Sequence, residues 1–166
     1  MFATGESYRK LDGEALAQRI AEEEAELDFD SFGVDDAWAV GSWLRDAARE
    51  RGYGVGFAVV LGEHRAFHAA TDGAAAVNDA WLERKFRTVR HFGHASLAVK
   101  AQYERGGGSF AADSALDPTV YAAAGGAFPI RVRGSLVGAA GVSGLEMHDD
   151  HALVVEALRA HRERRG

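Results

Sequence analysis

The 166-residue chain carries a formal net charge of -6, a hydrophobic content of 47% and no cysteine. Its length suits one domain with its own core, its acidic balance disfavours nucleic acid as a partner, and the lack of cysteine excludes disulfides, thiol nucleophiles and iron–sulfur clusters. No stretch is apolar enough to span a bilayer, and the first residues lack the apolar region of a secretion signal. We therefore expect a cytoplasmic protein without membrane contact.

The first fifty residues predict two helices. One runs from Leu11 to about Leu27 with Asp12 as its N-cap, and a short edge strand over Leu27–Phe32 follows it. The second covers about Asp35–Arg51, and Gly41 lies on the same face as Trp38, Leu44 and Ala48. A glycine inside a helix costs about 1 kcal/mol relative to alanine, so Gly41 predicts close packing against a neighbour.

Two β-hairpins are predicted farther along the chain. Each joins two segments through a short loop: Val55–Leu61 to Arg65–Ala70 across Gly62-Glu63, and Phe128–Arg133 to Leu136–Val142 across Gly134-Ser135. The second loop has the glycine-first form that suits the twist of paired strands.

The remaining elements are helical. A helix begins near Asn78, another follows Gly93, a short one lies near Pro118–Ala124, and the last covers about His148–Arg164. The order hairpin, helices, hairpin, helix predicts an α+β domain with an antiparallel sheet of four to five strands flanked by helices, rather than parallel crossover units.

One cation lies on the apolar face of the helix that begins near Asn78. At about 100° per residue, an arc of roughly 140° holds Trp81, Leu82, Phe86, Val89 and Phe92. Lys85 and Ser96 fall near the middle of this arc. In one interpretation Lys85 extends its ammonium past the stripe to solvent or pairs with a carboxylate of another helix. In the other, Lys85 lines a pocket with Arg84 and Thr88 and binds an anionic group such as a carboxylate.

Two glycines, Gly125 and Gly126, precede a strand that carries Pro129 near its start, where proline is tolerated. They either make the turn or bring bare backbone N–H groups up to a ligand. The spacing is not that of a dinucleotide-binding or phosphate-binding loop.

Ser143 resembles a nucleophile elbow, but Leu145 replaces the final glycine of that motif, so a turn into the last helix is favoured over a serine hydrolase. His148 and His151 are spaced to share a metal with Asp149 or Asp150, although acidic residues also suit a helix N-terminus. For His68, in a strand, we expect a backbone partner.

Three ordered motifs resemble the family of small heme-degrading-domain proteins and, more distantly, GlcG-like and HbpS-like heme-binding proteins. The motifs are Asn78-Asp79-x-Trp81-x-x-Arg84-Lys85-x-x-Thr88-Val89-x-x-Phe92-Gly93-His94-x-Ser96, Gly125-Gly126-x-Phe128-Pro129-Ile130, and Gly141-Val142-Ser143-Gly144-Leu145 followed by Asp150-His151-x-Leu153-Val154-Val155-Glu156-Ala157-Leu158. The resemblance extends from about Asp35 to Leu158.

This resemblance implies a profilin-like α+β fold over residues 1–166, with 1–33 as an N-terminal helical extension, and a homo-oligomer. It also implies heme binding or heme degradation, and any heme would be non-covalent because no C-x-x-C-H motif is present. The expected ligand-binding residues are Arg84, Lys85, Thr88, His94, Ser96, Gly125, Gly126 and Pro129, with His94 as the candidate iron ligand. The alternative function is a non-catalytic assembly or adaptor protein whose signature residues pack an oligomer interface. An enzyme acting on a small acid through Lys85 requires a lowered lysine pKa.

Overall fold

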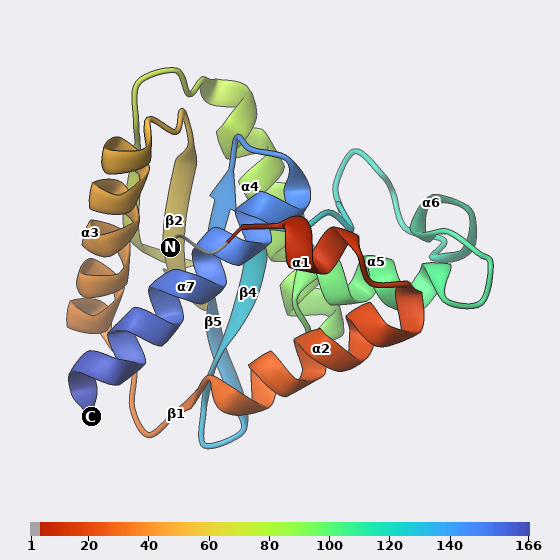
Figure 1. Cartoon of the computed structure of the whole chain (residues 1–166), viewed down its shortest axis with the longest axis horizontal. Coiled ribbons are helices and arrows are strands. Elements are labelled where there is room, and N and C mark those ends of the chain that lie inside the picture. Colours follow the sequence, from red (N-terminus) through yellow and green to blue (C-terminus); the bar gives the residue numbers. More distant parts are fainter. Residues whose placement is uncertain (1–3) are drawn as a thin grey trace.

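The computed structural model describes residues 4–166 and contains seven helices and five strands in that range (Figure 1). In chain order these are α1 (Glu6–Arg9), α2 (Gly13–Glu26), β1 (Asp28–Phe29), α3 (Val34–Arg51), β2 (Gly56–Leu61), β3 (His64–Ala70), α4 (Ala76–Phe92), α5 (Ser96–Glu104), α6 (Phe110–Asp113), β4 (Ala127–Val132), β5 (Ser135–Ser143) and α7 (Met147–Arg165).

The strands form one sheet in the order β1-β4-β5-β2-β3. Hairpins β2–β3 and β4–β5 are antiparallel, and β5 also pairs antiparallel with β2. Only the two-residue edge strand β1 runs parallel to its neighbour, β4. The predicted α+β class, both hairpins and the edge strand are confirmed.

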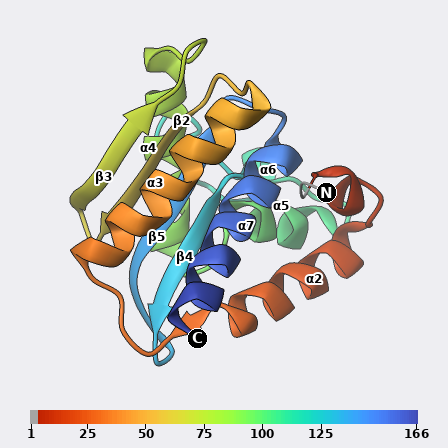
Figure 2. The same ribbon diagram turned by 60° about the vertical axis from the view of Figure 1, so that its left-hand side comes forward.

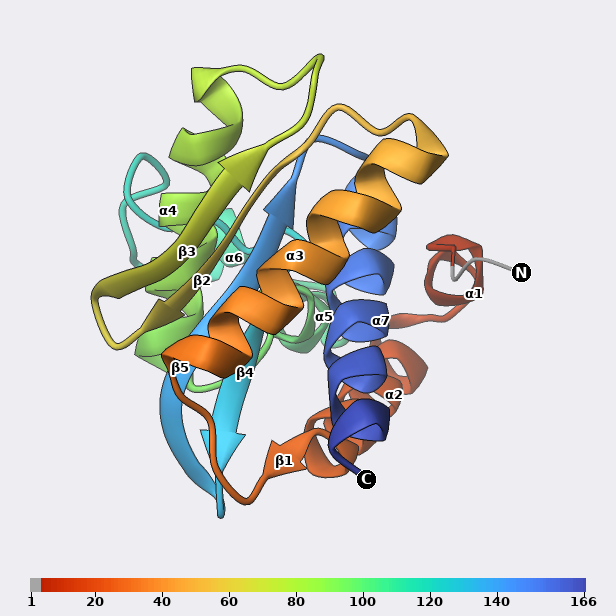
Figure 3. The same cartoon turned by 90° about the vertical axis from the view of Figure 1, so that its left-hand side faces the viewer.

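Helices cover both faces of the sheet, with α3 and α7 on one face and α4 on the other (Figures 2 and 3). Alternation along each strand gives each face its own core. In β2, Phe57 and Val59 join the large core under α3 and α7, whereas Ala58 and Val60 face α4. The smaller core is completed by Leu82, Phe86, Val89, Ala127 and Ala139.

Gly41 allows α3 to lie close to the sheet. A Cβ at this position would overlap the Phe67 ring of β3, so the predicted close packing is confirmed. Trp38 was predicted on the same face as Gly41, but it is 67% exposed and meets Phe67 edge-on, with ring centroids 5.5 Å apart. Among residues 4–166 the packing leaves most of this indole open to solvent.

The turn of the β4–β5 hairpin differs from the prediction by one residue. Val132 pairs with Ser135, so the loop residues are Arg133 and Gly134. Both have positive φ, 49° and 82°, as a type I′ turn requires at its two central positions. The expected Gly134-Ser135 loop is therefore wrong, because the strand register rather than the glycine position decides the turn.

The predicted short helix near Pro118–Ala124 is absent. Asp117 Oδ1 accepts hydrogen bonds from the Thr119 backbone N–H (2.8 Å) and hydroxyl (2.6 Å), which gives the chain a local alternative to helical bonding. The other five predicted helices are present, including the N-cap at Asp12, whose carboxylate accepts a bond from the Ala15 N–H, whereas the short helices α1 and α6 were not predicted. Within residues 4–166 no helix has the length and apolarity needed to cross a membrane.

Candidate functional site

Lys85 is buried on the inner face of α4, with 2% of its surface exposed. Its ammonium donates to the Val142 carbonyl of β5 and to Asp150 Oδ2 of α7, each at 3.2 Å. The predicted pairing with a carboxylate of another helix is confirmed, and the expected extension to solvent is wrong.

Asp150 is as buried as its partner, because it lies in the first turn of α7 under the end of β5. Its second oxygen, Oδ1, accepts the Leu145 backbone N–H at 3.0 Å, and the Gly144 backbone adds a further bond. The short segment between β5 and α7 thus wraps around this carboxylate.

Burial acts against both charges of this pair. It raises the pKa of Asp150 to about 6, although Lys85 and the two backbone donors oppose the rise. Burial also lowers the pKa of Lys85, and the nearby Asp150 only partly offsets this effect. The two groups therefore exchange a proton more readily than an exposed lysine and aspartate would.

A pocket of about 290 Å³ opens beside the Lys85–Asp150 pair. Trp81 of α4 and Met147 of α7 give it apolar walls, and Lys85, Asp150 and Ser143 give it polar ones. The remaining lining residues are Asn78, Ala124, Gly144 and Leu145.

Lys85 and Ser143 leave hydrogen-bond donors available for a ligand in this pocket. An ammonium has three N–H donors, and among the described residues Lys85 meets two acceptors. The Ser143 hydroxyl lies at the end of β5, 4% exposed, on the same wall. The serine is not part of a triad with His151, since that ring bonds to Glu23 on the other side of α7.

Arg84 and Thr88 hold the segment that follows α6. Arg84 donates to the Pro118 carbonyl at 2.6 Å, and its guanidinium lies 4.3 Å from the centroid of the Trp81 ring. The buried Thr88 hydroxyl accepts the Ala122 N–H at 3.1 Å. These two side chains thus support the Trp81 wall and the loop beside it.

The other expected ligand-binding residues position β4. The Ser96 hydroxyl, at the start of α5, exchanges hydrogen bonds with the Ala127 backbone N–H (3.1 Å) and carbonyl (3.3 Å). A Cβ at Gly125 would collide with the Met147 carbonyl, and one at Gly126, where φ is 132°, would lie 2.7 Å from Lys85 Nζ. Both glycines therefore make room for neighbours. Pro129 lies in β4 opposite Ala139, beyond the reach of β1, which pairs only with residues 131 and 132.

His94 follows the C-cap of α4 and does not line the pocket. Its Nδ1 bonds to Glu24 Oε2 at 2.8 Å, and about half of the side chain is exposed. Glu24 also accepts the Ala95 N–H and an Arg131 N–H, so it fixes the connection between α4 and α5.

A second buried polar cluster lies behind α7 and was not predicted. Glu23 of α2 accepts the Tyr8 hydroxyl at 2.6 Å and bonds to His151 Nε2 at 3.0 Å. All three side chains are at most 3% exposed. Burial would raise the pKa of Glu23, but the hydrogen bonds from His151 and Tyr8 outweigh it and lower the pKa. The only sequence signal was a histidine beside Asp150 and an acidic run in the first long helix.

Three further histidines, His68, His148 and His161, have acidic partners, and His161 bonds to Asp36 at 2.8 Å. His68 bonds to Asp79 of α4 at 2.7 Å instead of the expected backbone group, and His148 bonds to the N-cap residue Glu146 at 2.6 Å. Within residues 4–166 no group of three histidine or acidic side chains is arranged to hold a metal ion.

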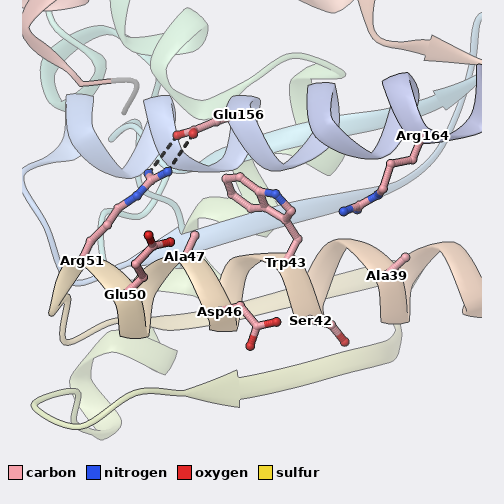
Figure 4. Close-up of a pocket in the computed structure, with 9 residues that line it drawn as sticks. All are labelled: Ala39, Ser42, Trp43, Asp46, Ala47, Glu50, Arg51, Glu156 and Arg164. Atoms are coloured by element: carbon pink, nitrogen blue, oxygen red, sulfur yellow. Dashed lines mark hydrogen bonds and ion pairs between the residues drawn. The ribbon is translucent and has the colours of Figure 1, made fainter. Parts of the chain in front are cut away.

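A larger and more open hollow of about 630 Å³ lies between α3 and α7 (Figure 4). Trp43 projects from α3 toward α7, and Arg51 forms a two-pronged ion pair with Glu156 at 2.7 and 2.9 Å (Figure 4). Asp46 and Glu50 line its α3 side. The Arg51 side chain is buried here too, but both of its terminal nitrogens are paired with Glu156, which lines the same hollow.

Comparison with known proteins shows relatives along most of the chain. The family model described as "Haem degrading protein HbpS-like" matches residues 32–159. A UPF0303 protein of Streptomyces coelicolor is 47% identical over 140 residues, which cover 84% of this chain and 89% of the relative. A UPF0303 protein of Brucella canis is 42% identical over 149 residues, covering 89% and 88%.

Solved structures share the fold. The crystal structure of Ybr137w protein matches with a TM-score of 0.82 and 26% identity, covering 89% of this chain and 88% of that one. The crystal structure of HbpS matches with a TM-score of 0.62 and 21% identity (78% and 88% covered). The crystal structure of a PduOC:heme complex matches with a TM-score of 0.66 and 17% identity, covering 78% of this chain and 94% of that one.

Proposed function

Since the chain belongs to the HbpS-like family of haem-degrading proteins, we propose that it binds a small carboxylate-bearing ligand, heme propionates included, in the Lys85 pocket. The carrying observation is a buried ammonium that lines a pocket and keeps one donor beyond its two acceptors in the described chain. A charge-assisted bond to a carboxylate is among the stronger single contacts that a protein makes.

The size of the pocket decides which part of a heme it suits. About 290 Å³ corresponds to roughly ten water molecules at ~30 Å³ each. A small organic acid or one propionate arm fits this space, whereas the macrocycle is much larger than the pocket of one chain. No histidine lines the pocket, so His94 could ligate iron only from outside it.

The expected ligand-binding residues then have two roles. Lys85 would bind the carboxylate, and Ser143, which was not among the expected residues, would add a hydroxyl contact. The others, from Arg84 to Pro129, would keep the walls in place, while His94 stays a candidate iron ligand only for a heme that extends outside the pocket. Oligomer assembly, the alternative, remains a prediction; it does not need Lys85, which already has a partner in its own chain.

Parallel titrations with hemin and with a small acid such as glycolate test the proposal. Wild type should bind with a saturable signal, a Soret shift for hemin and heat for glycolate. Lys85→Met should weaken both roughly tenfold or more, the usual value of a hydrogen bond to a charged group. Lys100→Met, on α5 and outside the pocket lining, is the matched control.

His94→Ala separates the two modes of heme binding. It should change the hemin spectrum only if the histidine ligates iron, and it should leave glycolate binding unchanged. A wild type that gives no saturable signal with either compound, or a Lys85→Met protein that binds as wild type does, would contradict the proposal.

A further inference from the structure

We propose that Lys85 forms an imine with a small aldehyde or ketone in this pocket, so that the pocket is a covalent site for a carbonyl compound. The inference rests on the proposed function, because the same space must admit the ligand. It goes further by assigning the lysine a reaction.

The sequence contains three lysines, Lys10, Lys85 and Lys100. The surroundings of Lys85 distinguish it from the other two. Lys10 pairs with Glu6 and its side chain is 71% exposed, and Lys100 pairs with Glu104 on the surface of α5. Lys85 alone combines burial, a pocket and a carboxylate at 3.2 Å.

The geometry directs a carbonyl carbon to one side of the nitrogen. Val142 and Asp150 occupy two directions around Lys85 Nζ. The Gly126 backbone blocks a third side, because a Cβ added at this glycine would lie only 2.7 Å from Nζ. The pocket is therefore the approach left for a reactant. Trp81 and Leu145 offer apolar surface for the carbon skeleton.

The amine must be neutral to react, and burial lowers the pKa of Lys85 toward that state. Burial shifts the pKa of Asp150 in the opposite direction, raising it to about 6, which favours the protonated carboxyl group. The carboxyl group is thus able to take a proton from the ammonium and return it later in the reaction.

The reaction balances without an added oxidant or reductant. The neutral Lys85 amine adds to the carbonyl carbon, a C–N bond forms, and one C–O bond of the carbonyl opens. Asp150 transfers a proton from nitrogen toward oxygen, which gives a carbinolamine. Loss of that oxygen as water forms the C=N bond, so one amine and one carbonyl yield one imine and one water.

Reductive trapping tests this inference on the full chain. The protein is incubated near pH 7 with glyoxylate and cyanoborohydride, and a carboxymethyl group on each lysine is followed by peptide mass spectrometry. Lys85 should be labelled measurably faster than Lys10 or Lys100, because burial lowers the pKa of Lys85 and so raises the neutral fraction of its amine. Glycolate, which has the carboxylate but no carbonyl, should protect Lys85 and leave the other two unaffected.

The result does not depend on a variant that folds, because the three lysines compete within the wild-type chain. Labelling of Lys85 no faster than of Lys10 and Lys100 would overturn the inference. If glycolate still binds in that case, the proposed function survives; if neither binding nor selective labelling occurs, both fail.

Discussion

Two buried polar clusters meet α7 at neighbouring residues, and they differ in what lies beyond them. Asp150 turns toward Lys85 and the pocket, whereas His151 turns toward Glu23 and Tyr8 under the N-terminal helices. In the enclosed cluster both oxygens of Glu23 have side-chain partners. In the cluster at the pocket an ammonium donor is left over. The buried His151 Nδ1 also has no hydrogen-bond partner among the described residues, but it does not line the Lys85 pocket. A buried charge without a full set of partners at a cavity wall indicates ligand binding, whereas the Glu23 carboxylate, bonded at both oxygens, indicates structure.

The two carboxylates also respond differently to burial. The pKa of Glu23 is lowered because hydrogen bonds from His151 and Tyr8 outweigh burial. The pKa of Asp150 is raised because burial outweighs Lys85 and the backbone donors. Glu23 and Asp150, which lie on opposite sides of α7, therefore change the stability of the fold in opposite directions as the pH rises.

The largest effect is expected from breaking the enclosed cluster. Glu23→Ala leaves the Tyr8 hydroxyl and the His151 ring without a partner in a space that is closed to water, so the free energy of unfolding should fall by about 3–5 kcal/mol. Urea denaturation measures the change. Glu22→Ala, an exposed neighbour on α2, should alter stability by less than about 0.5 kcal/mol. Equal losses for the two variants would refute a structural role for Glu23.

The pH dependence of stability should differ in sign between the clusters. Because the pKa of Asp150 rises from an ordinary 3.8 to about 6 in the folded state, its contribution is complete below about pH 4 and is lost as the pH rises to 6. The loss should reach roughly 2–3 kcal/mol, and Asp150→Asn should abolish it. Glu23, with a lowered pKa, stabilises above about pH 4.5 and loses this contribution in acid.

Denaturation of wild type, Asp150→Asn and Glu23→Gln from pH 3 to 7 measures both signs. The difference between wild type and Asp150→Asn should shrink as the pH rises, and that between wild type and Glu23→Gln should grow. If both differences in stability changed in the same direction as the pH rises, the two carboxylates would not differ as described.

The smallest effect on stability is expected for Lys85→Met. Methionine fills the space of the lysine stem, and Asp150 keeps its backbone donors and picks up a proton. At pH 7 that protonation costs about 1.4 kcal/mol or less, because the pKa is already about 6. Thermal unfolding should thus show a loss of about 1–2 kcal/mol at most. A loss as large as that of Glu23→Ala would make Lys85 a structural residue.

Local chemistry made much of the fold predictable. The N-cap Asp12, the packing of Gly41, both hairpins and the burial of Lys85 all follow from patterns within a few residues. The turn at Arg133-Gly134 was missed because register is set across the sheet. The exposure of Trp38 was missed because periodicity does not reveal where the sheet ends.

The candidate site was predictable only in part. The sequence identified Lys85 as the anomaly, but its partner Asp150 lies 65 residues away and seemed more relevant to a helix N-terminus. Ser143 was considered for a different chemistry. The Tyr8–Glu23–His151 cluster joins three distant segments, and no periodic pattern links a tyrosine and a glutamate to a histidine 128 or more residues later.

The first turn of α7 has a consequence for experiments that shorten the chain. Its outer side is fixed by the N-terminal residues, since the Gly5 N–H bonds to Asp149 and Arg9 pairs with Glu146 and Asp149. Its inner side carries Asp150 into the pocket. Removal of the first ten residues would remove the contacts that hold this turn from outside. An N-terminally truncated chain should therefore bind the ligand with altered affinity, although no residue of the pocket has been changed.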